Sequence, residues 1–198
     1  MRSEIVTVVT LLLAVAVLPA PAAEENQVKE LYRRGLAGDK AAVVQCIDAL
    51  ETVLRSDSRN QLARVYLGSA YTLRSRDLGF GPKKMQTLNH GIALMDEAVS
   101  AVPDDGKVRL ARALTTQSLP FFTGRASSTR KEFQLLAEIA QRSPSTFAEG
   151  DLQIIFYNAG LAAKANGNQD GAAIMFQEAL RHQADPALKK KTDAALVK

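Results

Sequence analysis

One spacing recurs four times along this 198-residue chain: a small residue, a larger residue four positions later, and a small or apolar residue three positions after that. Residues seven apart lie on one face of a helix, two turns apart. Small residues at these positions let a second helix approach closely, while the larger residue fills the space between them. The sequence therefore predicts closely paired helices. The four sets are Ala42, Cys46 and Ala49; Gly91, Met95 and Ala98; more loosely Thr129, Phe133 and Leu136; and Ala172, Phe176 and Ala179.

Helix-forming residues dominate the chain after its first 23 positions, and proline is rare inside the long segments. Turn signals such as Gly38-Asp39 and Gly167-Asn168 separate these segments, and Thr129 with Glu132 has the spacing of a capping box. We expect an all-α fold of antiparallel helical hairpins. The predicted helices cover about 25–37, 39–55, 59–76, 83–102, 105–119, 128–142, 146–166, 169–183 and 186–197.

The first 22 residues predict a secretory signal peptide. Arg2 gives the start a positive charge, residues 5–18 form an apolar run, and the small-x-small pattern of a cleavage site ends at Ala22. The run is shorter than the roughly 20 residues that span a bilayer, so a retained anchor is the weaker alternative. We therefore expect an exported protein, periplasmic if the source is a Gram-negative bacterium, with no permanent membrane span and one domain over residues 23–198.

Composition and charge argue against several classes of function. The chain has one cysteine and two histidines, and no Cys/His cluster has ligand spacing, so we predict no metal and no cofactor. The formal net charge of +4 is spread along the sequence, without the concentrated basic stripe and stacking aromatics that nucleic-acid binding needs. Cys46 occupies a packing position and predicts a buried thiol. With no nucleophile motif and no acid placed opposite a base, we expect no enzyme.

The segment from Phe156 to Leu180 resembles a nearly complete tetratricopeptide repeat (TPR). It has an aromatic residue, then Ala159-Gly160, a glycine turn, and the small–large–small set that begins at Ala172. A second unit matches through Leu67, Gly68, Tyr71, Gly91, Met95, Ala98 and Pro103, with an insertion between Gly68 and Gly91, and the other two units match only in their second helices.

The resemblance implies a short right-handed solenoid of stacked hairpins that binds partners on its concave face, usually without catalysis. Here it implies about four hairpins and a C-terminal capping helix in one repeat domain.

The first helix of each hairpin is expected to turn one stripe toward the inner groove. Some TPR modules hold a partner's terminal carboxylate with Lys and Asn on this stripe, and only Asn158 and Lys164 resemble that pattern here. The rest of the stripe is mostly apolar, which favours an apolar peptide, a partner helix or a small apolar ligand, although these side chains could instead pack neighbouring helices. The candidate residues are Leu62, Val65, Ser69 and Thr72 in the second unit and Ile154, Tyr157, Asn158, Leu161 and Lys164 in the fourth.

Two irregular loops join first and second helices in consecutive hairpins, so stacking places them on the same edge of the solenoid. They carry three phenylalanines beside cations, which suits an anionic amphiphile or a partner's surface. In the alternative interpretation the phenylalanines plug the space beneath the loops as a small satellite core. The candidate residues are Phe80, Lys83 and Lys84 in one loop and Phe121, Phe122 and Arg125 in the other.

These observations predict an exported, non-catalytic TPR scaffold or adaptor that binds another protein or peptide of the cell envelope. The alternative is a periplasmic carrier that holds a small apolar or amphiphilic ligand for a transporter.

Overall fold

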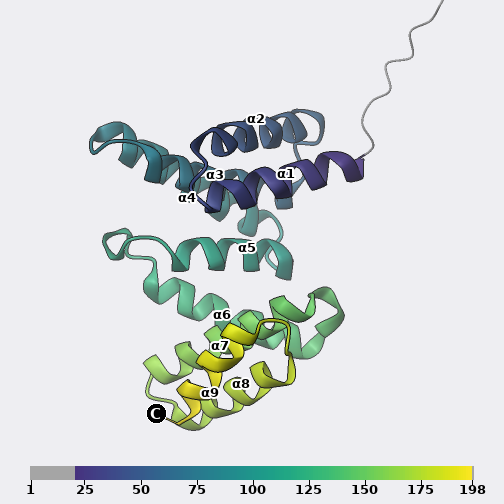
Figure 1. Cartoon of the computed structure of the whole chain (residues 1–198), viewed down its shortest axis with the longest axis vertical. Coiled ribbons are helices and arrows are strands. Elements are labelled where there is room, and N and C mark those ends of the chain that lie inside the picture. Colours follow the sequence, from purple (N-terminus) through teal and green to yellow (C-terminus); the bar gives the residue numbers. More distant parts are fainter. Residues whose placement is uncertain (1–20, 198) are drawn as a thin grey trace, which may run out of the picture.

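The computed structural model describes residues 21–197, which form nine α-helices and two short 3-10 turns, with no strand among them (Figure 1). Each predicted helix is present within a few residues of its expected bounds, so the all-α prediction is confirmed. The helices are α1 (Pro21–Leu36), α2 (Lys40–Ser56), α3 (Gln61–Asp77), α4 (Pro82–Ala101), α5 (Gly106–Gln117), α6 (Ala126–Arg142), α7 (Glu149–Ala165), α8 (Gln169–Arg181) and α9 (Pro186–Leu196). The turns are η1 (Phe121–Thr123) and η2 (Pro144–Thr146).

The expected signal peptide, residues 1–22, lies outside the described residues except for Pro21 and Ala22, which begin α1. Within residues 21–197, no helix combines the length and the apolar character needed to cross a bilayer.

Consecutive helices pair as four hairpins, α1–α2, α3–α4, α5–α6 and α7–α8, stacked one on the next, and α9 packs on the last (Figure 1). The first and last hairpins turn in the same way. Gly38 and Gly167 have φ of 103° and 78°, a region that favours glycine, and the next residue caps the second helix. Asp39 accepts a hydrogen bond from the Ala42 amide, and Asn168 accepts one from the Gly171 amide.

The predicted small–large–small sets lie in α2, α4, α6 and α8, and they face the partner helix as expected. Gly91, Met95 and Ala98 are buried, as are Ala172, Phe176 and Ala179. Gly160 of α7 lies directly against the Phe176 ring, where a Cβ would come within 2.5 Å of a ring carbon. The recurring spacing therefore marks real helix contacts.

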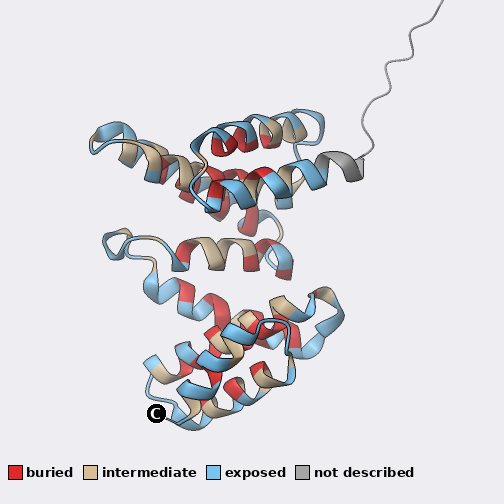
Figure 2. Cartoon of the chain, viewed as in Figure 1, coloured by how far each residue is buried: buried red, intermediate tan, exposed pale blue. Residues whose placement is uncertain are grey.

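Buried residues run through the stack as a series of clusters, each built from neighbouring helices (Figure 2). One joins α1, α2 and α3, the next joins α3, α4 and α5, and a third extends from α5 to α8. Each hairpin thus packs within itself and against the hairpins next to it, as in other repeat architectures.

The predicted capping box at Thr129 and Glu132 is wrong. Helix α6 begins a turn earlier, at Ala126, so both residues lie inside the helix. The Thr129 hydroxyl donates to Thr116 Oγ1 of α5 at 2.9 Å. Glu132 is 8% exposed and binds two arginines of α5. These side chains therefore face a neighbouring helix rather than the end of their own.

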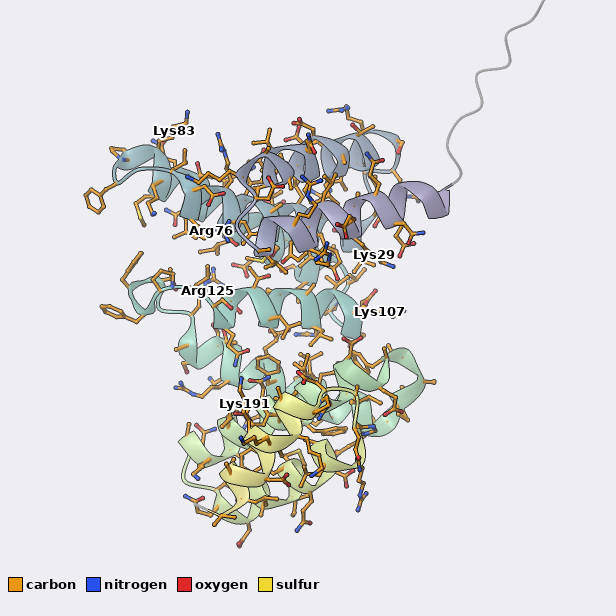
Figure 3. All side chains as sticks on the ribbon, in the orientation of Figure 1. Lys29, Arg76, Lys83, Lys107, Arg125 and Lys191 are labelled. Atoms are coloured by element: carbon orange, nitrogen blue, oxygen red, sulfur yellow. The ribbon has the colours of Figure 1, made fainter. Side chains whose placement is uncertain are left out.

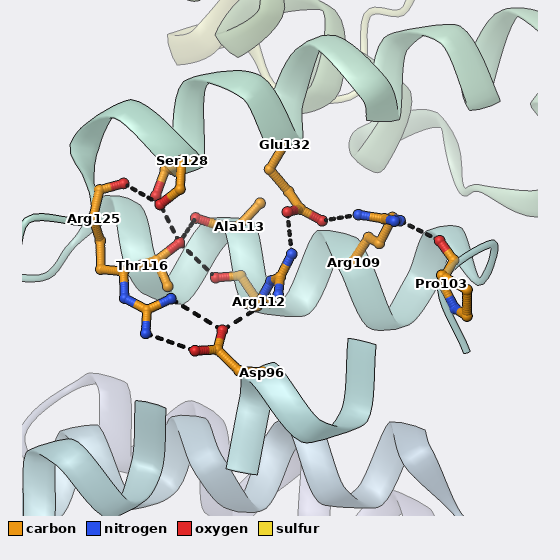
Figure 4. A network of polar contacts seen from close by, with 10 residues as sticks. Asp96, Pro103, Arg109, Arg112, Ala113, Thr116, Arg125, Ser128 and Glu132 are labelled. Carbon is orange, nitrogen blue, oxygen red and sulfur yellow. Dashed lines mark hydrogen bonds and ion pairs between the residues drawn. The ribbon is translucent and has the colours of Figure 1, made fainter. Parts of the chain in front are cut away.

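A partly buried ionic network joins α4, α5 and the start of α6 (Figure 4). Glu132 accepts from Arg109 at 2.8 Å and also pairs with Arg112. Arg112 reaches Asp96 of α4 at 3.3 Å, and Arg125 holds both oxygens of Asp96 at 3.0 and 2.6 Å. The network fixes the third hairpin against the second.

Candidate binding site

The first helices of three successive hairpins line an open groove of about 650 Å³. We call it the first-helix groove. Its apolar surface includes Tyr32 and Leu36 from α1, Leu62 and Tyr66 from α3, and Leu110 and Leu114 from α5. Leu36 is 56% exposed and Leu62 38%, so apolar side chains are presented to solvent along the groove. Covering such a surface with a ligand lowers the free energy, because apolar side chains are removed from water.

A chain of hydroxyl groups holds the three lining helices in register. The Tyr32 hydroxyl lies 2.6 Å from Ser69 Oγ, which lies 2.7 Å from Thr115 Oγ1. Because the Thr115 hydroxyl donates to the Ala111 carbonyl, it accepts from Ser69, and Ser69 in turn accepts from Tyr32. The chain therefore runs in one direction across α1, α3 and α5.

Two tyrosines form the floor of the groove, with ring centroids 5.4 Å apart in an edge-to-face arrangement. Burial raises the pKa of the Tyr32 hydroxyl, against the opposing effect of its hydrogen bonds to Ser69 and Thr115. Burial also raises the pKa of Tyr66, and the charges of Asp151 and Glu25 add to the rise. Both hydroxyls therefore stay neutral at physiological pH, as polar groups in an apolar floor.

Charges of both signs surround the mouth of the groove. Glu25 and Lys29 of α1 pair at 2.6 Å, and Lys107 of α5 and Asp151 of α7 also line the groove. The pKa of Glu25 is lowered first by its hydrogen bond to Lys29 and less strongly by the charge of Lys107. The mouth thus offers a mixed polar rim, which suits orientation of a ligand more than attraction of one charge.

The arrangement is suited to binding. Within residues 21–197, no three His, Cys, Asp or Glu residues gather where they could hold a metal ion. Cys46 is buried as predicted, and burial raises its pKa to about 11, so the thiol stays protonated at neutral pH. The groove combines an apolar floor, a few neutral hydroxyls and a charged rim, which is the composition of a ligand or peptide site.

The structure separates the predicted stripe. Leu62 lines the first-helix groove, but Val65, Ser69 and Thr72 are buried inside the stack and cannot contact a partner. In α7, Ile154, Tyr157 and Lys164 are half-buried and do not line the groove. The prediction for Val65, Ser69 and Thr72 was wrong because successive residues of a helix are about 100° apart around its axis. A stripe chosen one or two positions away from the groove-facing residues therefore faces the core.

Asn158 and Leu161 lie instead on a second, smaller pocket of about 190 Å³, which Phe121 also lines. The Asn158 amide donates to the Ile154 carbonyl at 2.9 Å and accepts from Gln117 of α5. Its hydrogen-bonding groups are therefore engaged within the chain. This arrangement does not support the carboxylate clamp that Asn158 and Lys164 resembled.

The three loop phenylalanines do not plug their loops. Phe80 and Phe121 are fully exposed and Phe122 is 57% exposed, which contradicts the satellite-core interpretation. Phe121 and Phe122 meet edge to face with centroids 6.2 Å apart, and Phe80 stands on the turn of the preceding hairpin.

The cations predicted at the rim of these loops differ in role. Lys83 is exposed, and within residues 21–197 it has no ion-pair partner. The Lys84 amino group reaches the carbonyls of Arg76 and Leu78 at 3.5 and 3.3 Å. The prediction for Arg125 is wrong, because its guanidinium is bound to Asp96 in the ionic network and is not a free cation.

Sequence reasoning missed most of the groove, because it used only helices with recognisable repeat motifs. The signal was present in α1, where Glu25, Lys29, Tyr32 and Leu36 follow helical spacing, and in α5, where Lys107, Leu110, Ala111 and Leu114 do so. Comparing the phase of these stripes with that of α3 would have placed the groove correctly.

No family model and no curated protein matches the sequence, but solved structures match the fold. TTC0263, a TPR protein of Thermus thermophilus, superposes with a TM-score of 0.60 at 17% identity, over 89% of this chain and 89% of that one. A point mutant of MamA gives 0.50 at 19% identity, over 88% of this chain and 84% of the other. This chain has the TPR fold. The TPR resemblance found in the sequence is therefore confirmed at the level of the fold.

Proposed function

We propose that the chain is a non-catalytic TPR scaffold that holds a segment of another protein in the first-helix groove. One observation carries the proposal: an open apolar surface continues across the first helices of three hairpins. TPR-like folds commonly mediate protein–protein interaction, and this groove lies where the first helices face one another.

The lining of the groove favours a segment with one apolar face. Leu36, Leu62 and Leu114 accept apolar side chains, and the Tyr66 hydroxyl offers a hydrogen-bonding group beside them. An amphipathic helix or an extended apolar peptide meets these requirements, because its polar face would remain beside the charged mouth.

The proposal includes export and a role in the cell envelope. The leader-like first 22 residues support it, with an apolar run too short for a typical membrane span. Amino-terminal sequencing of the protein recovered from its own cells tests this part. A start near Ala23 is expected, and a start at Met1 contradicts it.

The binding proposal is tested by charged substitutions at exposed groove positions. Leu36→Asp combined with Leu62→Asp places two carboxylates on the apolar surface and leaves the buried core unchanged. Ile174→Asp is the matched control, since Ile174 is 53% exposed on α8 and does not line the groove.

The measurement is quantitative mass spectrometry of proteins captured from envelope extract by each immobilised variant. We expect one or a few proteins to be captured equally by the wild type and the Ile174 variant, and at least about tenfold less by the groove variant. Equal capture by all three forms contradicts the proposal.

The volume of the groove also favours a second function, a carrier for a small apolar or amphiphilic ligand. Ligand pockets commonly enclose about 300–1,000 Å³, and the groove holds about 650 Å³. Native mass spectrometry of the gently purified chain distinguishes the two. A retained small molecule that is lost in the double groove variant supports the carrier, and its absence together with groove-dependent protein capture supports the scaffold.

A further inference from the structure

Each hairpin begins and ends on the same side of the stack. The turns inside the hairpins therefore all lie along the opposite edge. Figure 1 shows the α1–α2, α3–α4, α5–α6 and α7–α8 turns toward its left side, and the connections between hairpins toward its right. We define the turn edge as residues 37–40, 74–84, 118–131 and 164–170.

The turn edge gathers positive charge that the sequence spreads along the chain. Its four segments contain nine Lys and Arg against three Asp. The connections on the opposite edge, residues 55–60, 102–107, 142–151 and 181–186, contain five Lys and Arg against six Asp and Glu. Figure 3 shows Arg76, Lys83 and Arg125 toward the turn edge, and Lys29 and Lys107 toward the opposite edge.

Several of the turn-edge cations are available to a partner. Lys83, Arg130 and Lys131 are exposed, and none has an ion-pair partner within the described part of the chain. Arg130 and Phe121 both line the small pocket, so a cation and an exposed aromatic residue border the same hollow of this edge.

The phenylalanines are the most exposed apolar groups of this edge. Phe80 stands between Gly79 and Gly81 at the tip of the α3–α4 turn, where Gly81 has a φ of 150°. Phe121 and Phe122 stand on η1, which ends at Gly124 with a φ of 69°. Both turns thus depend on a glycine conformation that holds aromatic side chains outward from the helices.

We propose that the turn edge docks on an anionic lipid bilayer, with Phe80, Phe121 and Phe122 entering the interface. Aromatic rings partition into the region of the lipid headgroups, and unpaired Lys and Arg nearby are attracted to anionic headgroups. The rings stand on protruding turns of separate hairpins, an arrangement that fits a broad surface better than a narrow pocket. The edge shares no residue with the first-helix groove, so the protein could hold its partner while attached to a membrane.

Flotation of the full chain with lipid vesicles tests this proposal. One set of vesicles is phosphatidylcholine alone, and the other contains about 30 mol % phosphatidylglycerol. We expect binding to the anionic vesicles that weakens as salt is added, and little binding to phosphatidylcholine.

Two variants and two controls locate the contact. Phe80→Ser with Phe121→Ser should weaken binding at least about tenfold, because two interfacial rings are lost. Lys83→Ala with Lys131→Ala should weaken it about 25-fold, since each of the two cations near the surface contributes about fivefold. Arg59→Ala with Arg142→Ala removes two exposed cations of the opposite edge, and Ile174→Ser removes an exposed apolar residue elsewhere; both should bind like the wild type.

Thermal unfolding keeps the test interpretable, because these side chains are exposed and their loss should leave the midpoint unchanged. No binding to anionic vesicles, equal binding to both vesicle types, or unchanged binding of the Phe and Lys variants overturns the proposal. Loss of a captured protein in the Phe variant without any vesicle binding assigns the edge to a protein partner instead. The Leu36 and Leu62 groove variant should still bind vesicles, so this proposal and the proposed function fail separately.

Discussion

In the second hairpin, α3–α4, two glycines bring the helix backbones into contact, whereas in the third hairpin, α5–α6, charged side chains add to the apolar packing between the helices. A Cβ on Gly68 would lie 2.5 Å from the Gly91 carbonyl oxygen, and a Cβ on Gly91 would lie equally close to that of Gly68. In α5–α6, Arg109 and Arg112 converge on Glu132. The contact in α3–α4 depends on the absence of side chains at two positions, and the contact in α5–α6 combines an apolar core with electrostatic attraction between side chains.

The difference shows that a repeat architecture fixes the arrangement of its helices without fixing the chemistry between them. The glycine contact requires particular residues at both positions, so it leaves a recognisable motif. The ionic contact joins Arg109 and Arg112 of α5 to Glu132 of α6, which are 23 and 20 residues apart in the sequence, and charged residues so far apart form no recognisable motif. This explains why the second repeat resembles a TPR more clearly than the third does.

The largest effect is expected from Glu132→Gln. The substitution removes a carboxylate that binds two largely buried arginines and leaves Arg109 without its partner. Removing one member of a buried ion pair costs about 3 kcal/mol or more. Urea unfolding followed by circular dichroism measures the loss, and a change below about 1 kcal/mol would show that the network adds little to stability.

Gly68→Ala tests the other hairpin and should cost about 2 kcal/mol. Overpacking of a core usually costs about 1–3 kcal/mol, and here the new methyl group meets backbone atoms that cannot move aside. Gly150→Ala is the control, since its Cβ would lie 3.6 Å from Ala184 Cβ, an ordinary contact. We expect the control to be neutral or slightly stabilising. Equal effects of the two substitutions would refute the backbone-contact account.

The free energy of unfolding should also fall at high pH, where Tyr71 of α3 loses its proton. Burial, followed by its hydrogen bond to Glu51, raises the pKa of Tyr71 to about 12 from an ordinary value of 10.0. A raised pKa means that the folded state favours the protonated form, so this contribution is complete below pH 10 and is lost as the pH rises through 12.

The comparison of wild type with Tyr71→Phe isolates that contribution. The wild type should lose about 1 kcal/mol more than the variant between pH 10 and 12, because partial exposure screens the full effect of the shift. Unfolding titrations at a series of pH values measure it. Parallel curves for the two proteins would show that Tyr71 does not couple folding to pH.

The smallest effect is expected from Glu97→Gln. This variant makes the same change of Glu to Gln as at position 132, but in an exposed ion pair of α3–α4, the hairpin whose helices meet at two glycines. Glu97 is 62% exposed and lies 3.6 Å from Arg64. Exposed ion pairs contribute between about 0 and 1 kcal/mol, so the change should be below about 0.5 kcal/mol. A cost as large as that of Glu132→Gln would mean that burial does not separate the two hairpins.

The sequence was sufficient for features that depend on residues close together in the chain. Turn signals such as Gly167-Asn168 located the helices, and spacings such as Gly91, Met95 and Ala98 located their contacts. The residues that form each of these signals lie within one helix or one turn. Each could therefore be interpreted without knowing the rest of the fold.

Features that depend on several helices at once could not be predicted in this way. Arg125 lies close to Phe121 and Phe122 in the sequence, but the fold brings its side chain to Asp96 of another helix. Ser69 belonged to an apparent surface stripe, but it is buried between Tyr32 and Thr115. The positive edge became visible only when stacking brought the four turns together.

Site-specific photo-crosslinking in living cells tests the central claim most directly. A photoreactive phenylalanine analogue is placed at Leu62 in the first-helix groove or at Ile174 on α8, and the products are analysed by mass spectrometry. We predict a protease-sensitive adduct with another protein at Leu62 that is absent at Ile174. The same adduct at both positions, an adduct at Ile174 alone, or a small-molecule adduct at Leu62 would contradict a groove that holds a partner protein.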